Sequence, residues 1–268
     1  MKLSNVFPCL KNLSIGDISE YVLKLATTLP TLENLSLGKV YGRYNLSTAL
    51  PNLVNLSIGS IVPNAIVIPR SDAQAEAFEL KVALPNLINL TIGKITFIPV
   101  ALGEGLSRSN IVFNLKNMLP NLESLTIGDI EPHNTVKLPL LTNLTNLTIG
   151  NICRTATLEC PDKLDNLASL GIKDISLSAT VKLPTSLNNL KWLSIGDLES
   201  ASSGWFSGKL QTVLKLPDTL PNLIRFSIGN IGKDAILKLP TSCEKLEDVT
   251  VGTIEDNDTF LQVARLTA

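Results

Sequence analysis

The residues that could perform covalent or acid–base chemistry are few in this chain. Histidine occurs once, as His133, and cysteine occurs four times, as Cys9, Cys153, Cys160 and Cys243. A nucleophile needs a base beside it, and the sequence contains neither a nucleophile elbow nor a glycine-rich phosphate loop. No CxxC or histidine spacing accompanies the cysteines, so the usual zinc patterns are excluded. We therefore expect no enzyme activity, no metal and no cofactor, and we expect Cys160, which replaces a repeated leucine, to be a buried thiol.

A few aromatic and charged residues near the C-terminal end form a pattern that is typical of binding surfaces. Trp192, Arg225 and Asp248 share one column of the repeat described below, where the seven earlier copies carry Asn or Ser. Trp205 and Phe206 stand nearby, between Gly204 and Gly208. A tryptophan and an arginine at equivalent positions of adjacent strands favour stacking of the guanidinium on the indole, on the outward face of the sheet. Because exposed Trp and Arg dominate interface energetics, these are candidate partner-binding residues. Packing of the Trp205 segment onto the sheet explains them equally well.

Composition excludes several classes of partner. The 268 residues include 23 Lys+Arg and 24 Asp+Glu, for a formal net charge of −1. Nucleic-acid binding needs clustered positive charge, which this balance does not supply. No apolar run approaches the roughly 18–20 residues of a membrane helix, and the N-terminal segment lacks the apolar centre of a secretory signal. We therefore expect no nucleic-acid partner and no membrane insertion, in a protein that is intracellular or is a segment of a secreted or surface protein.

One phrase, with the consensus L-P-N-L-x-x-L-[ST]-I-G-x-I, recurs ten times between residues 7 and 254. Its glycine column, where Lys173 stands once, advances by 21–23 residues in six steps and by 33–35 residues in three. A weaker phrase, such as V-K-L-P at 181–184, lies upstream of each core phrase. Each repeat therefore predicts two short extended segments joined by turns. The glycine column predicts either a positive φ or close clearance between neighbouring backbones.

Alternation within the phrase predicts which side chains face inward. In the second copy Leu35 and Leu37 lie two residues apart and point to one side of a strand, whereas Ser36 points to the other. Leu32 and Val40 lie on the turns that flank this strand and complete the inward set. One repeat buries too little apolar surface to offset the ordering of about 22 residues, so such coils fold only as a stack. The outward Ser/Thr column predicts a solvated face or, alternatively, a flat docking surface.

The pattern resembles the leucine-rich repeat superfamily, because the family core L-x-x-L-x-L matches Leu32, Leu35 and Leu37 and their equivalents. The family's asparagine position, however, falls on Val40 and on isoleucine in later copies, which makes the chain more similar to divergent bacterial or protist repeats. Another Asn column stands before the first core leucine, and we expect its amides to stack and satisfy turn backbone groups. This column comprises Asn52, Asn86, Asn121, Asn143, Asn166, Asn189 and Asn222.

The resemblance implies one β-rich solenoid domain over residues 1–268, either whole or as a segment of a longer protein. Its expected form is about ten coils of 21–23 residues, with a parallel sheet on one face, short strands and turns on the other, and three insertions. In the first insertion the segments at 67–69 and 78–80 compete as the strand, and Ser71-Asp72 predicts an N-capped helical turn. We expect insertions at one phase to project from one edge, at 62–77, 96–111 and 199–212.

These observations favour a non-catalytic module that recognises a protein through the outward sheet face and the insertion edge. The identity of that partner is not encoded in the pattern. One alternative is a structural solenoid that self-associates through its open ends. Another is the substrate-recognition part of a larger bacterial effector. The absence of polar capping segments at the ends favours a segment of a longer protein, or ends covered by a partner, over self-polymerisation.

Overall fold

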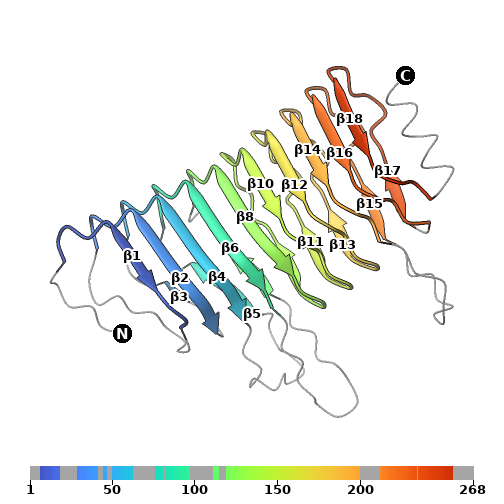
Figure 1. The fold of residues 1–268 in the computed structure, drawn as a ribbon. Coiled ribbons are helices and arrows are strands. Elements are labelled where there is room, and N and C mark those ends of the chain that lie inside the picture. The colour runs from blue at the N-terminus through green and yellow to red at the C-terminus, as the bar shows by residue number, and fades with distance from the viewer. Residues whose placement is uncertain are drawn as a thin grey trace, which may run out of the picture.

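The chain folds as a stack of β coils, seen in a computed structural model (Figure 1). The structure describes residues 7–18, 29–41, 45–46, 50–62, 76–80, 83–96, 111–114, 119–199, 212–233 and 235–255. All regular structure in these ranges is β-strand, and no helix occurs within them. The coils follow one another in chain order from the blue N-terminal end to the red C-terminal end. This arrangement confirms a β-solenoid.

The ten core phrases form a single parallel sheet, the ten-stranded sheet, in which every neighbour is the next copy of the phrase. Its strands, in spatial order, are β1 (Asn12–Ile15), β2 (Asn34–Tyr41), β4 (Asn55–Val62), β6 (Asn89–Ile95), β8 (Ser124–Ile130), β10 (Asn146–Ile149), β12 (Ser169–Ile172), β14 (Trp192–Ile195), β16 (Arg225–Ile228) and β18 (Asp248–Val251). Equivalent residues pair without slippage, as in Leu35 with Leu56 and Leu56 with Leu90. The register therefore holds even across the long steps.

The weaker phrases form shorter parallel sheets on the opposite side of the solenoid. One contains β9 (Thr135–Lys137), β11 (Thr157–Glu159), β13 (Thr180–Lys182), β15 (Val213–Lys215) and β17 (Ile236–Lys238). The other contains β3 (Asn45–Leu46), β5 (Glu76–Leu80) and β7 (Ile111–Asn114). These strands confirm the two extended segments per repeat wherever the structure describes both.

The three insertions occupy the same position in their repeats. Each lies between a strand of the ten-stranded sheet and the next strand of a short sheet, because β5, β7 and β15 follow them directly. The first insertion thus precedes its strand, which decides between the competing segments in favour of 78–80. Ser71-Asp72, for which we predict a helical turn, lies outside the described residues.

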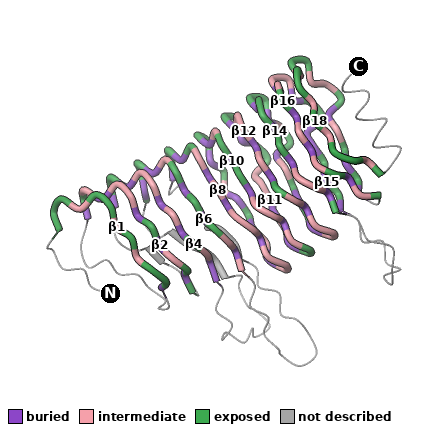
Figure 2. Tube along the Cα trace, viewed as in Figure 1, coloured by how far each residue is buried: buried purple, intermediate pink, exposed green. Residues whose placement is uncertain are grey.

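Inward side chains form one continuous apolar core along the solenoid. Figure 2 shows the buried residues, in purple, recurring from coil to coil. Leu35, Leu56 and Leu90 are only 1–2% exposed. Val40 and Ile61, at the position where leucine-rich repeats carry asparagine, are also buried, at 0% and 3% exposure. Each such side chain contributes roughly 1.5–3 kcal/mol when it is buried. This apolar column therefore adds to the core.

The glycine column is explained by clearance between coils. A Cβ on Gly93 would lie 2.0 Å from the carbonyl oxygen of Gly59, and one on Gly196 would lie 2.7 Å from the Lys173 oxygen. No glycine of this column has a φ in the left-handed region. Of the two predicted reasons for glycine, close approach of neighbouring backbones is thus the one that operates.

Candidate binding face

The predicted row Trp192, Arg225 and Asp248 lies on the outward face of the ten-stranded sheet. These residues begin β14, β16 and β18 and are paired in register, Trp192 with Arg225 and Arg225 with Asp248. The Trp192 side chain is 46% exposed, whereas Leu193, the next residue, is 2% exposed. Alternation along the strand thus places one in solvent and the other in the core. The structure brings the three residues together as predicted.

Within this row Arg225 forms an ion pair with Asp248. The Arg225 Nε lies 3.9 Å from the Asp248 Oδ2, and both side chains are largely exposed. An exposed ion pair of this kind contributes little to folding, which leaves both groups available to a partner. Stacking of Arg225 on Trp192 stays a prediction. Trp205 and Phe206, the other two candidate residues, lie outside the described residues.

An amide ladder covers the same outward column in the first four coils, and sequence analysis missed it. Asn34 Nδ2 donates to Asn12 Oδ1 at 2.6 Å, and Asn55 Nδ2 donates to Asn34 Oδ1 at 2.6 Å. Asn89 continues the ladder by donating to Asn55 Oδ1 at 2.7 Å. The available signal was four asparagines in the column that carries Trp192 farther on. With the neighbouring Ser/Thr residues they line a shallow groove of about 420 Å³.

The second Asn column, on the turns before the strands, forms the ladder of amides predicted from sequence. We call it the turn ladder, to distinguish it from the amide ladder of Asn12 to Asn89. Each side-chain nitrogen donates to a backbone carbonyl of the preceding coil. In the middle of the solenoid the donations are Asn86 to Pro51, Asn121 to Pro85, Asn143 to Pro120 and Asn166 to Thr142, all at 2.7 Å. Asn189 and Asn222 repeat the bond farther along. These bonds confirm that the column satisfies backbone carbonyls of the turns.

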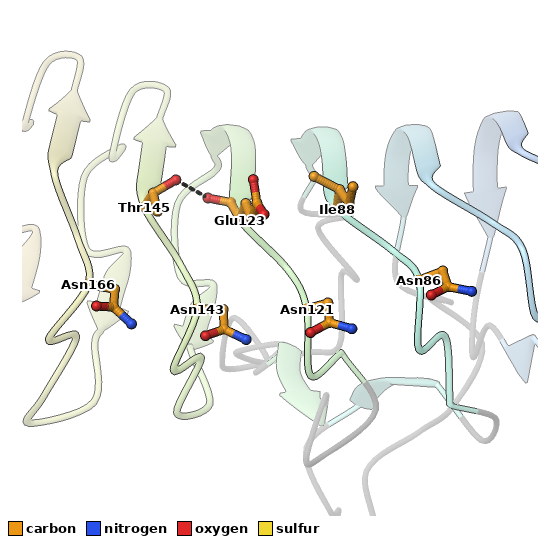
Figure 3. Close-up of a pocket in the computed structure, with 7 residues that line it drawn as sticks. All are labelled: Asn86, Ile88, Asn121, Glu123, Asn143, Thr145 and Asn166. Atoms are coloured by element: carbon orange, nitrogen blue, oxygen red, sulfur yellow. Dashed lines mark hydrogen bonds between the residues drawn. The ribbon is translucent and has the colours of Figure 1, made fainter.

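Beside this turn ladder lies a groove of about 550 Å³, which we call the amide groove. One wall consists of the four amides of Asn86, Asn121, Asn143 and Asn166. The other wall consists of Ile88, Glu123 and Thr145. Figure 3 shows the amides nearly parallel, with each nitrogen toward the preceding coil and each oxygen away from it. The groove crosses several coils, so it suits an elongated ligand.

A further ladder of side chains lies just after the glycine column. Lys39 N donates to Asp17 Oδ1 at 2.8 Å, and Asp197 N donates to Asp174 Oδ1 at 2.9 Å. Asn230 N likewise donates to Asp197 Oδ1 at 2.7 Å. These carboxylates accept from backbone amides of the next coil. The Asp and Asn residues of this column therefore have a structural role.

On the opposite side of the solenoid, Glu159 of β11 is held between two lysines. It pairs with Lys137 at 3.0 Å and with Lys182 at 3.0 Å. Hydrogen bonds from these two ammonium groups, first Lys137 and then Lys182, lower the pKa of the Glu159 carboxyl. The three residues share one outward column of the short sheet.

The thiols and the histidine do not assemble into reactive machinery among the described residues. Cys160 is partly buried against the core rather than fully enclosed, and burial raises its pKa to about 12. Burial also raises the pKa of Cys153 and of Cys243. His133 Nδ1 lies 2.8 Å from the Thr155 hydroxyl on a turn. Thiols of raised pKa carry little thiolate at neutral pH and are poor nucleophiles.

The described ranges contain neither a cluster of metal ligands nor a helix that could span a membrane. Within them, no three His, Cys, Asp or Glu side chains gather closely enough to hold a metal ion. No helix in this part of the chain is long and apolar enough to cross a bilayer. Comparison with family models, with curated proteins and with solved structures found no match to this chain.

Proposed function

We propose that this chain is a non-catalytic recognition module that binds a protein through the outward face of the ten-stranded sheet. The observation that carries the proposal is the exposed indole of Trp192 beside Arg225, in an outward column whose seven earlier members are Asn or Ser. Trp and Arg are both among the residue types most enriched at the positions that dominate binding energy. A rigid parallel sheet holds both in place before binding, which reduces the entropy lost on association.

We also propose that the solenoid is of the leucine-rich repeat type. The support is the L-x-x-L-x-L core, whose leucines are buried in register, together with the parallel sheet formed by those phrases. The departure is the buried Val40 and Ile61 in place of the family's asparagine. The amides that satisfy turn carbonyls stand instead at the turn ladder, from Asn52 to Asn222. In this chain the ladder of Asn side chains therefore lies on the turn before each strand rather than at the family's position after it.

The test of the recognition proposal is capture of a partner followed by titration. The immobilised chain would be incubated with cell extract in parallel with Trp192→Ala and Arg225→Ala. A matched control is Leu140→Ala, because Leu140 is 60% exposed but lies between β9 and β10 rather than on the outward face. A protein that is captured by wild type and by Leu140→Ala is then purified and titrated against each variant.

We expect Trp192→Ala to weaken this purified complex at least tenfold, which corresponds to about 1.4 kcal/mol. Leu140→Ala should bind within twofold of wild type. A partner that binds Trp192→Ala and Arg225→Ala as tightly as wild type contradicts the proposal that this face is the binding site.

A second candidate function, self-association of the solenoid, is favoured by one observation. The inward residues of the outermost described strands, Leu13 and Ile15 of β1 and Val249 and Val251 of β18, are only partly buried, unlike their equivalents in interior coils. Light scattering over a concentration series tests this candidate, because end-to-end stacking raises the mass with concentration. A constant monomer mass contradicts it. A role as the recognition part of a larger effector stays a prediction.

A further inference from the structure

The amide oxygens that line the amide groove are acceptors held in a fixed orientation. Each Asn of its wall uses its side-chain nitrogen on a carbonyl of the preceding coil, at 2.7 Å, so a flipped amide would lose that bond. The oxygens of the four exposed amides are thereby fixed as acceptors, and within the described structure no protein donor reaches them. Thr145 adds no donor, because its hydroxyl donates to the Glu123 carbonyl oxygen at 3.0 Å, as Figure 3 shows.

The groove also carries one uncompensated negative charge. Glu123 is exposed, and no Lys, Arg or His lines the groove with it. Its neighbours in the same column are Ile88 and Thr145, and no cation among the described residues pairs with it. By contrast, Glu33 in the same column pairs with Lys11 at 2.9 Å. The groove is therefore suited to a cationic donor and unsuited to an anion.

The chain itself shows how such a donor is bound. In the last described coil the turn column carries Lys245 in place of Asn, and its Nζ donates to the Oδ1 of Asn222 at 2.7 Å. Asn222 belongs to the same turn ladder and donates its own nitrogen to the Asn188 carbonyl at 2.7 Å. An alkylammonium group on a ladder oxygen is thus an interaction that this surface already makes. In the amide groove the equivalent oxygens of Asn86 to Asn166 receive no such lysine.

We propose that the amide groove binds a linear alkylammonium ligand that lies across the coils. Successive coils in a parallel sheet are about 4.8 Å apart, so the ladder presents acceptors at a spacing similar to that of amines joined by three or four methylenes. The ammonium groups bind the Asn oxygens and the Glu123 carboxylate, while the methylenes lie against Ile88. Alkylammonium groups of this kind occur in free polyamines and in the lysine side chains of an extended partner segment. This binding does not depend on Trp192.

The experiment is a calorimetric titration of the whole chain at low ionic strength, where exposed charges are least screened. The probes are spermine, a tetralysine peptide and, as an uncharged ligand of similar length, tetraethylene glycol. Glu123→Gln removes the charge with little change of shape at an exposed position. Glu33→Gln is the matched control in the same column outside the groove, and Trp192→Ala is the control for the other face. Circular dichroism verifies that each variant is folded.

We expect saturable binding of spermine or tetralysine that Glu123→Gln weakens about tenfold, whereas Glu33→Gln and Trp192→Ala stay within twofold of wild type. Binding of spermine but not the peptide identifies a free polyamine as the ligand, and the reverse identifies a partner segment. The proposal is overturned if neither cation binds, if Glu123→Gln binds as tightly as wild type, or if tetraethylene glycol binds as tightly as spermine. It is also overturned if Trp192→Ala abolishes the binding.

Discussion

Gly128 stands so close to Gly93 of the preceding coil that a Cβ on Gly128 would lie 1.3 Å from the Gly93 carbonyl oxygen. The two residues are 35 positions apart in sequence, across one of the long steps, yet their backbones approach so closely that no side-chain atom fits between them. The contact atom is a backbone carbonyl, which cannot move aside as a flexible side chain can.

The first prediction follows from this contact. Gly128→Ala should destabilise the protein by about 3 kcal/mol, the upper range for overpacking, because β6 and β8 must separate to admit the methyl group. The matched control is Gly171→Ala. A Cβ there meets only Thr148 side-chain atoms at 3.9 Å, and replacing a strand glycine removes an entropic penalty of roughly 0.5–1 kcal/mol. Urea unfolding measures both variants, and equal stability of the two contradicts the clearance argument.

The second prediction concerns Ser178, whose conformation and unpaired hydroxyl both lower the stability of the folded state. Its φ is 60°, in the left-handed region, and its buried hydroxyl has no hydrogen-bond partner. Ala179 N donates to Ser176 O at 3.0 Å across this turn, so Ser178 occupies the third position, where a positive φ favours glycine. Ser178→Gly should raise the free energy of unfolding by about 1–2 kcal/mol.

The control for Ser178→Gly is Ser176→Gly, two residues earlier in the same turn. Ser176 is not among the residues with a positive φ. Glycine there gains nothing from the left-handed region and adds flexibility to the unfolded chain, so we expect a loss of roughly 0.5–1 kcal/mol. A stabilising Ser176→Gly would show that the Ser178 effect does not come from its backbone conformation.

The third prediction is a pH dependence from Glu159. Because Lys137 and Lys182 lower its pKa in the folded state, its stabilisation is full above the unfolded pKa of the carboxyl and is lost as the pH falls through the lowered folded value. Glu159→Gln should therefore cost about 0.5–1 kcal/mol at pH 7 and nothing at low pH. Urea unfolding from pH 7 to pH 2 measures the convergence. Glu123→Gln, which has no ion pair to lose, should unfold like wild type at pH 7, and a loss equal to that of Glu159→Gln would contradict the argument.

The fourth prediction separates the binding face from the core. Trp192→Ala should change the free energy of unfolding by less than about 1 kcal/mol, since its side chain is 46% exposed and outside the core. Phe226→Ala, on the neighbouring strand but pointing inward at 3% exposure, should cost about 3–5 kcal/mol. Thermal unfolding of both variants provides the measurement. If Trp192→Ala is as destabilising as Phe226→Ala, Trp192 supports the fold rather than a partner.

Much of the architecture could be predicted because its signals lie close together in the sequence. Leu35 and Leu37 mark the inward side of a strand by their spacing alone, and both are 2% exposed. The turn ladder could be predicted because Asn recurs at one place in seven of the ten phrases. The amide ladder of Asn12 to Asn89 was missed, although its residues also recur, because an outward Asn on a strand is equally compatible with hydration.

The candidate site was less predictable than the fold. The row of Trp192, Arg225 and Asp248 follows from the repeat alignment, but the pairing of Arg225 with Asp248 depends on side-chain conformations. The amide groove left no sequence signal of its own. It forms only when several coils stack, because its two walls, one containing Asn121 and the other containing Glu123, are each built from residues of successive coils.

The sequence by itself therefore determined the periodic coil and the identity of its buried columns. These follow from apolar spacing, which acts within a few residues and needs no knowledge of the neighbouring coil. Only the tertiary structure decided which groups meet between coils: the glycine clearance at Gly93 and Gly128, the direction of each amide and the orphaned hydroxyl of Ser178. Such contacts join residues 21–36 positions apart, and they form only once the apolar columns have stacked the coils in register.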